Sequence, residues 1–159
     1  MPKAREHARP YPDERRLRRS AAGRDPRGFR GSVLRLLLDT HALIWALATP
    51  GKLPKELRTE LAGGEHEVFA SAASTWEIAI KSAIGKIDAD LDEIIEASAA
   101  TGFEELPIRR IHTARVGDLP SFHQDPFDRL LIAQALEEGL TLVTRDPVFG
   151  DYRVPTLWR

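Results

Sequence analysis

The chain has 159 residues, of which 42% are hydrophobic and 30% are charged, so it is long enough and apolar enough for one domain with a proper core. The absence of cysteine excludes disulfides, thiolate zinc sites and cysteine nucleophiles, and no apolar stretch of about 18 residues or more predicts a membrane span. Because the N-terminus is basic but has no apolar segment, it is not a secretory signal, and we expect a cytoplasmic protein.

The net charge of −1 conceals two oppositely charged parts. Residues 1–31 hold ten Lys and Arg and four Asp and Glu, a net charge of +6, which leaves −7 for the rest of the chain. Residues 1–32 have almost no aliphatic side chains, and we expect a disordered basic arm there, before a folded domain at 33–159. Three interpretations of the arm stay open: it binds RNA, it is a solvated tail, or it is a start-site artefact that is not made in the cell, because a valine codon at Val33 can act as a start.

The folded part is predicted to alternate strands and helices. In chain order, we expect a strand at 33–38, helices at 40–47 and 54–61, a strand at 67–71, helices at 74–86 and 91–101, a strand at 103–108, a helix through Val116, a helix at 125–139, and strands at 140–144 and 154–158. Strands separated by helices predict a three-layer α/β/α domain with a central, mainly parallel sheet of four to five strands.

Local signals define some of these boundaries. Ser74 and Glu77 have the spacing of a capping box at a helix start. Asp125 is a good N-cap, Pro126 suits the first helical position, and Gly139 is a typical helix end. The helix at 125–139 is therefore the best defined element in the sequence.

Acidic residues recur where strands end and helices begin. Asp39 directly follows the first strand, Glu77 lies near the start of the helix after the second, Asp125 and Asp128 open the long helix, and Asp146 follows the strand at 140–144. In an open parallel sheet, ligands bind beyond the carboxyl ends of the strands. If the sheet is parallel, all of these carboxylates can approach that edge.

Such a cluster has a chemical consequence, because several ionised carboxylates repel one another unless a cation neutralises them. Ligands that are all oxygen favour Mg²⁺ or Mn²⁺ over zinc, and such ions assist displacement at a phosphodiester. Each acid also has a simpler interpretation as a helix cap or turn residue, and the sequence alone leaves both interpretations open.

The chain resembles PIN-domain ribonucleases, in particular the VapC-type toxins of type II toxin–antitoxin pairs. The resemblance covers about 33–159 and rests on "LLLDTHALIWAL" (36–47), "SAASTWEIAIKSAIGKI" (71–87), "HQDPFDRLLIAQALEEGLTLVTRDPVF" (123–149) and the final "VPTLW" (154–158). It implies a Mg²⁺- or Mn²⁺-dependent endoribonuclease with a PIN-like fold, an RNA substrate, a cognate antitoxin as partner, and a homodimer.

The same resemblance assigns roles to single residues. It implies that the catalytic and metal-binding acids are Asp39, Glu77, Asp128 and Asp146. Asp125 belongs to the "DPFD" form of the motif, so it is either a further ligand or only the helix cap. Supporting roles are expected for two hydroxyl side chains: Thr144 would orient Asp146 or a water, and Thr40 would do the same for Asp39.

Several other polar side chains lie near these acids. Arg129 and Arg145 would either bind phosphate or pair with the neighbouring acids, and Lys81 is expected to pair with Glu77 one helical turn earlier. We expect His123 to have a loop role rather than a role as a metal ligand.

The remaining aromatic side chains are expected to have packing roles. His41 would pack or hydrogen-bond at the helix start, although it could also contact substrate. Trp45, Trp76 and Trp158 are expected in the core or in a dimer contact rather than stacked on bases.

Two other functions are compatible with an acid after the first strand. A phosphatase that uses Asp39 as its nucleophile would normally carry a second Asp two residues later, where this chain has His41. A non-catalytic PIN-like module that binds RNA or protein is the other alternative, although the presence of all four acids disfavours it.

Overall fold

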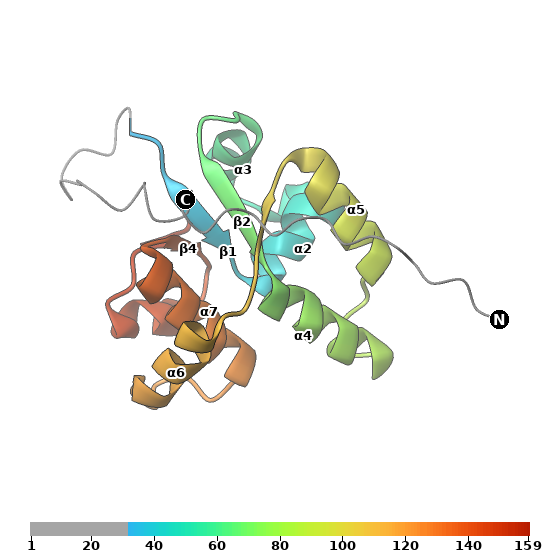
Figure 1. Ribbon diagram of the computed structural model, residues 1–159. Helices are drawn as coiled ribbons and strands as arrows, with labels where there is room; N and C mark the ends of the chain where they lie inside the picture. Colours follow the sequence, from blue (N-terminus) through green and yellow to red (C-terminus); the bar gives the residue numbers. More distant parts are fainter. Residues whose placement is uncertain (1–31) are drawn as a thin grey trace.

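A computed structural model of the protein describes residues 32–159 (Figure 1), so the predicted arm lies outside the described residues except for Ser32. In chain order the elements are β1 (Arg35–Leu38), α2 (Thr40–Ala48), η1 (Pro50–Lys52), α3 (Lys55–Ala62), β2 (Glu67–Ser71), α4 (Ala72–Ala83), α5 (Leu91–Thr101), β3 (Glu104–Leu106), α6 (Arg110–Asp118), α7 (Pro126–Glu138), β4 (Thr141–Val143), η2 (Pro147–Tyr152) and β5 (Thr156–Leu157). Every predicted helix and strand is present, and some of the strands are shorter than predicted. None of the helices between 32 and 159 has the length and apolar character needed to cross a membrane.

The five strands form one sheet in the order β3-β2-β1-β4-β5. All four neighbouring pairs are parallel, with Leu38 opposite Ala70 on one side and opposite Val143 on the other. The prediction of a parallel α/β sheet is therefore confirmed. Because β1 is the central strand, the residue that follows it lies in the middle of the carboxyl edge.

Apolar side chains on both faces of the sheet are buried, which explains the uninterrupted leucine run in β1. Leu37 packs into a core with Phe69 and Leu142, whereas Leu36 and Leu38 point into a second core on the opposite face. Successive side chains of a strand point to opposite faces, so a strand between two helical layers is apolar on both; the buried Arg35 at the start of β1 is the exception, and its guanidinium pairs with Glu67 and the Glu138 carbonyl. The result is a sheet fixed firmly on both sides.

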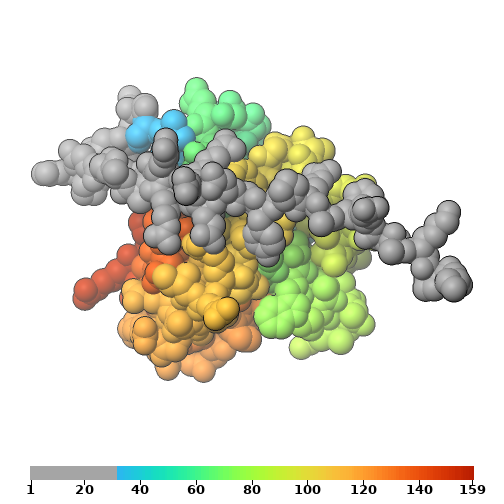
Figure 2. Space-filling model, viewed as in Figure 1, coloured from blue at the N-terminus to red at the C-terminus, as the bar shows by residue number. Residues whose placement is uncertain are grey.

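Helices complete the two outer layers. Figure 1 shows α6 and α7 on one side of β1 and β2, and α2 and α5 on the other. The space-filling view from the same direction shows that α4 and α6 both reach the surface (Figure 2). Helix α4 contacts α2, α5 and α7, so it connects the two layers at the end of β2.

The start of α4 differs from the prediction. Its N-cap is Ser71, whose hydroxyl accepts a hydrogen bond of 2.9 Å from the Ala73 N–H, so the predicted capping box of Ser74 and Glu77 is wrong. The reason is that β2 leads directly into the helix without a loop. Ser74 is instead buried within the first turn, and its hydroxyl has no hydrogen-bond partner among residues 32–159. The Glu77 carboxylate is thereby left available for other contacts.

Candidate active site

Five carboxylates line one pocket at the carboxyl edge of the sheet. The pocket has a volume of about 480 Å³, and its lining residues are Asp39, His41, Glu77, Lys81, His123, Asp125, Asp128, Arg145, Asp146, Pro147 and Phe149. All four acids predicted as catalytic, and Asp125, are among them. Parallel strands and the helices that follow them bring these residues together from positions up to 107 apart in the sequence.

Asp39 both caps a helix and lines the pocket. Its Oδ1 accepts a hydrogen bond of 2.6 Å from the Ala42 N–H, and its own N–H donates to the Val143 carbonyl at 3.1 Å, which extends the ladder between β1 and β4. Burial raises the pKa of Asp39, and the hydrogen bonds from Ala42 and Thr144 oppose that rise. The capping and pocket interpretations are therefore compatible for this residue.

Glu77 is buried, and its two carboxylate oxygens have different partners. The Thr40 hydroxyl donates to Oε2 at 2.5 Å, and Lys81 forms the predicted ion pair with Oε1. The prediction that Thr40 supports Asp39 is wrong, because its hydroxyl points to Glu77. Lys81 also contacts Asp125 Oδ2 at 3.3 Å, so one ammonium group partly neutralises two acids from α4 and the start of α7.

The two acids at the start of α7 have distinct environments. Asp125 is the N-cap, and its Oδ1 accepts a hydrogen bond of 2.8 Å from the Phe127 N–H. Asp128 has no capping role, and burial together with the negative charge of Asp125 raises its pKa from the ordinary value of 3.8 to about 7. Repulsion from Glu77 and Asp39 contributes to the same rise. Asp128 is thus the acid whose ionisation is most opposed by its surroundings.

Asp146 begins the short helix η2, where its Oδ1 accepts a hydrogen bond of 2.9 Å from the Val148 N–H. The buried Thr144 hydroxyl accepts from the Asp146 N–H at 3.1 Å and also hydrogen-bonds to Asp39. Thr144 therefore connects the acid after β1 with the acid after β4, which agrees with its predicted supporting role.

His123 contributes to the site in a way that the sequence analysis did not anticipate. It lies in the loop before α7 as expected, but its Nε2 is 3.2 Å from an oxygen of both Asp128 and Asp146. Its Nδ1 accepts a hydrogen bond of 3.1 Å from the Asp125 N–H, so the ring hydrogen lies on Nε2 and faces the carboxylates. The sequence feature that could have indicated this role is the position of His123 two residues before Asp125, the cap of α7.

The two arginines near the acids behave differently from each other. The Arg129 guanidinium donates to the carbonyls of Val116, Leu119 and Pro120 at 3.0, 3.1 and 2.6 Å. The end of α6 and the next loop occupy its donors, so the predicted ion pair between Arg129 and the neighbouring acids is wrong among residues 32–159, whereas phosphate binding stays a prediction. Arg145 lines the pocket, with its guanidinium carbon 4.7 Å from the ring centre of Trp45.

The tryptophans divide into two groups. Trp45 and Trp158 are partly buried beside the second core, with ring centres 5.9 Å apart, and His41 lies 5.7 Å from Trp45. Trp76 is 53% exposed and contacts Phe127 edge to face, so it is not a core residue.

The carboxylates of the pocket suit a hard divalent cation, although they are not already arranged around a common point. Carboxylate oxygens are the donors that Mg²⁺ and Mn²⁺ prefer, and the pKa of Asp128 is raised first by burial and then by neighbouring negative charge that a cation would offset. Within 32–159, however, no three acid or histidine side chains are arranged so that they could hold a metal ion as they stand. Lys81 and His123 instead supply the charges and donors that the acids contact.

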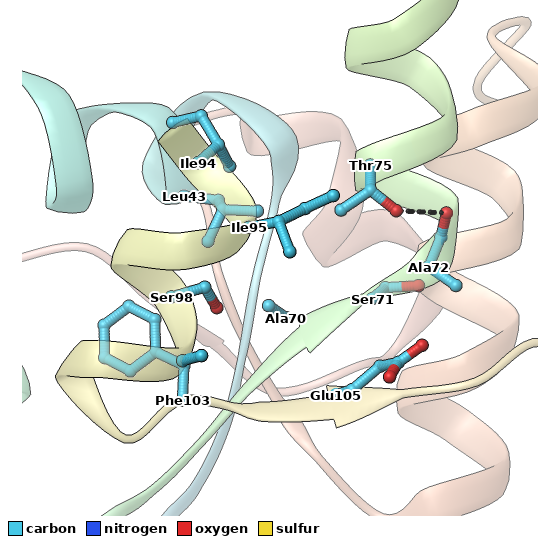
Figure 3. A pocket seen from close by; sticks show the side chains of 11 residues that line it. Leu43, Ala70, Ser71, Ala72, Thr75, Ile94, Ile95, Ser98, Phe103 and Glu105 are labelled. Carbon is cyan, nitrogen blue, oxygen red and sulfur yellow. Dashed lines mark hydrogen bonds between the residues drawn. The ribbon is translucent and has the colours of Figure 1, made fainter. Parts of the chain in front are cut away.

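A second cavity, of about 360 Å³, lies between α5, α4 and the sheet (Figure 3). Side chains such as Leu43, Ile94, Ile95 and Phe103 make it mostly apolar, and among the described residues Glu105 is the single ionisable one that lines it. Because a lone carboxylate in an apolar setting offers little for ionic chemistry, the acid pocket is the better candidate for an active site.

Comparisons with known proteins agree with the fold described above. The PIN domain family model matches residues 36–155. The chain is 29% identical over 133 residues to Ribonuclease VapC22 of Mycobacterium tuberculosis (strain ATCC 25618 / H37Rv), an alignment that covers 77% of this chain and 98% of that protein.

Solved structures share the fold at low sequence identity. The structure of VapBC2 from Rickettsia felis, bound to a DNA fragment from its promoter, matches with a TM-score of 0.61 and 17% identity over 79% of this chain and 100% of the other. The structure of FitAcB from Neisseria gonorrhoeae matches with a TM-score of 0.52 and 21% identity, and the match covers 77% of this chain and 96% of the other.

Proposed function

The chain belongs to the PIN-domain family, and we propose that it is a metal-dependent endoribonuclease that acts as the toxin of a toxin–antitoxin pair. The observation that carries this proposal is the gathering of Asp39, Glu77, Asp128 and Asp146 in one pocket at the carboxyl edge. The similarity to Ribonuclease VapC22 supports RNA as the substrate.

The four acids would together hold Mg²⁺ or Mn²⁺. When bound, such an ion supplies charge stabilisation for the phosphodiester and a more acidic water as nucleophile. Asp125 is better explained as the cap of α7, since one of its oxygens accepts from the helix backbone and the other contacts Lys81. Asp128, which has no capping role, is therefore the stronger ligand candidate of the two.

Residues around the acids would fix their positions and their charge. Thr40 and Thr144 restrain Glu77 and Asp39 by hydrogen bonds, so that neither carboxylate needs to be oriented when substrate arrives. His123 holds a hydrogen at Nε2 between Asp128 and Asp146, and its interaction with Asp128 opposes the rise in the pKa of that acid. In the ion-free protein Lys81 forms ion pairs with Glu77 and Asp125.

The alternatives have less support. A phosphatase that uses Asp39 would need a general acid two residues later, and His41 occupies that position. A non-catalytic module would have no reason to keep five carboxylates in one pocket, where burial raises the pKa of Asp39 and of Asp128. A test for a covalent phosphoenzyme, which we expect to be negative, separates the phosphatase from the nuclease.

The proposed partner is an antitoxin, because the matched structures include VapBC2, a pair bound to promoter DNA. We also propose a homodimer, supported by the exposed apolar side chains of α4 and its end: Trp76 at 53%, Ile80 at 40% and Ile84 at 60%. A toxin that degrades cellular RNA would act in the cytoplasm. Light scattering of the purified chain at several concentrations tests the dimer.

The nuclease proposal is tested by cleavage of a mixed-sequence RNA with the full-length chain. We expect cleavage with Mg²⁺ or Mn²⁺, none in EDTA, and a loss of at least about 100-fold for Asp39→Asn. Asp88→Asn is the matched control, because Asp88 is exposed and does not line the pocket. Cleavage by Asp39→Asn at the unchanged rate would exclude the proposed site.

A further inference from the structure

Basic side chains around the acid pocket mostly have partners within the protein. Lys81 contacts two carboxylates, and so does His123. Arg129 donates to backbone carbonyls at the end of α6 and in the loop that follows it. An RNA phosphate that approaches the acids would be repelled by them, and these three basic side chains are already engaged.

Arg145 is the exception among the described residues. It lines the pocket and is exposed, and within 32–159 its guanidinium has no contact with a carboxylate or a carbonyl oxygen. Its contact is with the ring of Trp45, over which the guanidinium carbon lies at 4.7 Å. A stacked guanidinium keeps its N–H donors in a fixed plane, with their edges available to a ligand.

The platform under Arg145 is itself supported. Trp45 packs against Trp158 and is partly buried beside the second core, and the ring of His41, which also lines the pocket, lies 5.7 Å from the Trp45 ring. Arg145 is also next in sequence to Thr144 and Asp146, two residues held by hydrogen bonds within the site. Its backbone is therefore fixed relative to the acids.

We propose that Arg145, stacked on Trp45, binds a phosphate of the RNA chain next to the phosphate that is cleaved. This inference rests on the proposed nuclease function and specifies how the same pocket holds its substrate. A planar guanidinium suits a phosphate because two parallel N–H groups can donate to two phosphate oxygens. One fixed cation beside the acids would offset their repulsion and set the position of the strand.

The test measures binding of a fluorescent single-stranded RNA to the full-length chain in EDTA, where no cleavage is expected, over a range of salt concentrations. We expect Arg145→Ala to weaken binding about tenfold. The slope of log K against log salt should fall in magnitude by about 0.7, the value for one phosphate contact on a single strand. Arg145→Lys should restore the slope but only part of the affinity, because lysine keeps the charge without the planar fork.

Arg110→Ala is the matched control, since Arg110 is exposed at the start of α6 and does not line the pocket. It removes the same charge and also reports any contribution of net charge alone. Equal effects of Arg110→Ala and Arg145→Ala, or no effect of Arg145→Ala, would overturn the inference and point to another ligand for Arg145, such as an acidic segment of a protein partner. Cleavage of RNA by the unaltered chain with Mg²⁺ would then still support the nuclease proposal, so the two failures are distinguishable.

Discussion

Replacing Asp128 by asparagine removes the carboxyl group whose pKa is raised to about 7, and we expect this change to stabilise the metal-free protein at alkaline pH. The unfolded chain releases this proton near the ordinary value of 3.8. Between those two values the folded protein binds more protons than the unfolded chain, so the free energy of unfolding falls as the pH rises. Above about pH 7 Asp128 is ionised in both the folded and the unfolded state, and the free energy of unfolding falls no further.

The size of the effect follows from the same two values. A tenfold change in proton affinity is worth about 1.4 kcal/mol, so a rise from 3.8 to about 7 corresponds to at most about 4 kcal/mol. The Asp128 side chain is 24% exposed and Nε2 of His123 is 3.2 Å away, so solvent and small rearrangements would reduce this free-energy cost. We therefore expect Asp128→Asn to gain about 2 kcal/mol relative to the unaltered chain between pH 4 and pH 8.

The assay is urea unfolding in EDTA at pH 4, 5, 6, 7 and 8, with both proteins compared at each pH. Asp88→Asn serves as the control, because it removes an exposed carboxylate outside the pocket and should show no such trend. In Mg²⁺ at pH 8 the order should reverse, since ion binding stabilises only the protein that keeps its ligands. A stability difference that does not change with pH in EDTA would refute the reasoning.

Three further changes test separate contacts. Lys81→Met should lower the melting temperature in EDTA, because the acids then lack their internal cation. For the same reason Mg²⁺ should raise the melting temperature of this variant more than that of the unaltered chain. Scanning fluorimetry that shows an equal rise in both proteins would contradict this. Arg129→Ala should cost about 2 to 3 kcal/mol in urea unfolding, because three carbonyl contacts are lost, and a cost below about 0.5 kcal/mol would show that water replaces them. Burial acts to raise the pKa of Glu138, but hydrogen bonds from His112 and Arg109 outweigh it and lower that pKa, so the stabilisation is present above pH 4.5 and is lost as the pH falls further. Glu138→Gln should therefore cost more at pH 7 than at pH 3, and a cost independent of pH would count against that ion pair.

Features that depend on neighbouring residues could be predicted from the sequence. Asp125, Pro126 and Gly139 define α7 because the Asp125 side chain caps the next few N–H groups, and the proline and the left-handed glycine set their own backbone angles. The placement of Asp39 followed from an apolar run that ends on an acid, since a parallel sheet directs the ends of its strands to one edge.

Features that depend on distant segments could not be predicted. Arg129 looked like a phosphate ligand because it follows an acid, but the end of α6 provides carbonyls that no sequence pattern indicates. The contacts of His123 with Asp128 and Asp146 require the loop before α7 to fold back to the residue after β4. From its position in the sequence Thr40 could hydrogen-bond to Asp39 or to Glu77, and it is the packing of α2 against α4 that brings its hydroxyl to Glu77.

The most direct test of a single cooperative acid site is the single-turnover rate of RNA cleavage at saturating Mg²⁺ for Asp39→Asn, Asp146→Asn and the double variant. Residues that act as one unit give losses that do not add, so the double variant should be about as slow as the slower single variant. A double variant slowed by the product of the two separate losses, or single variants that cleave at the unaltered rate, would contradict a shared site.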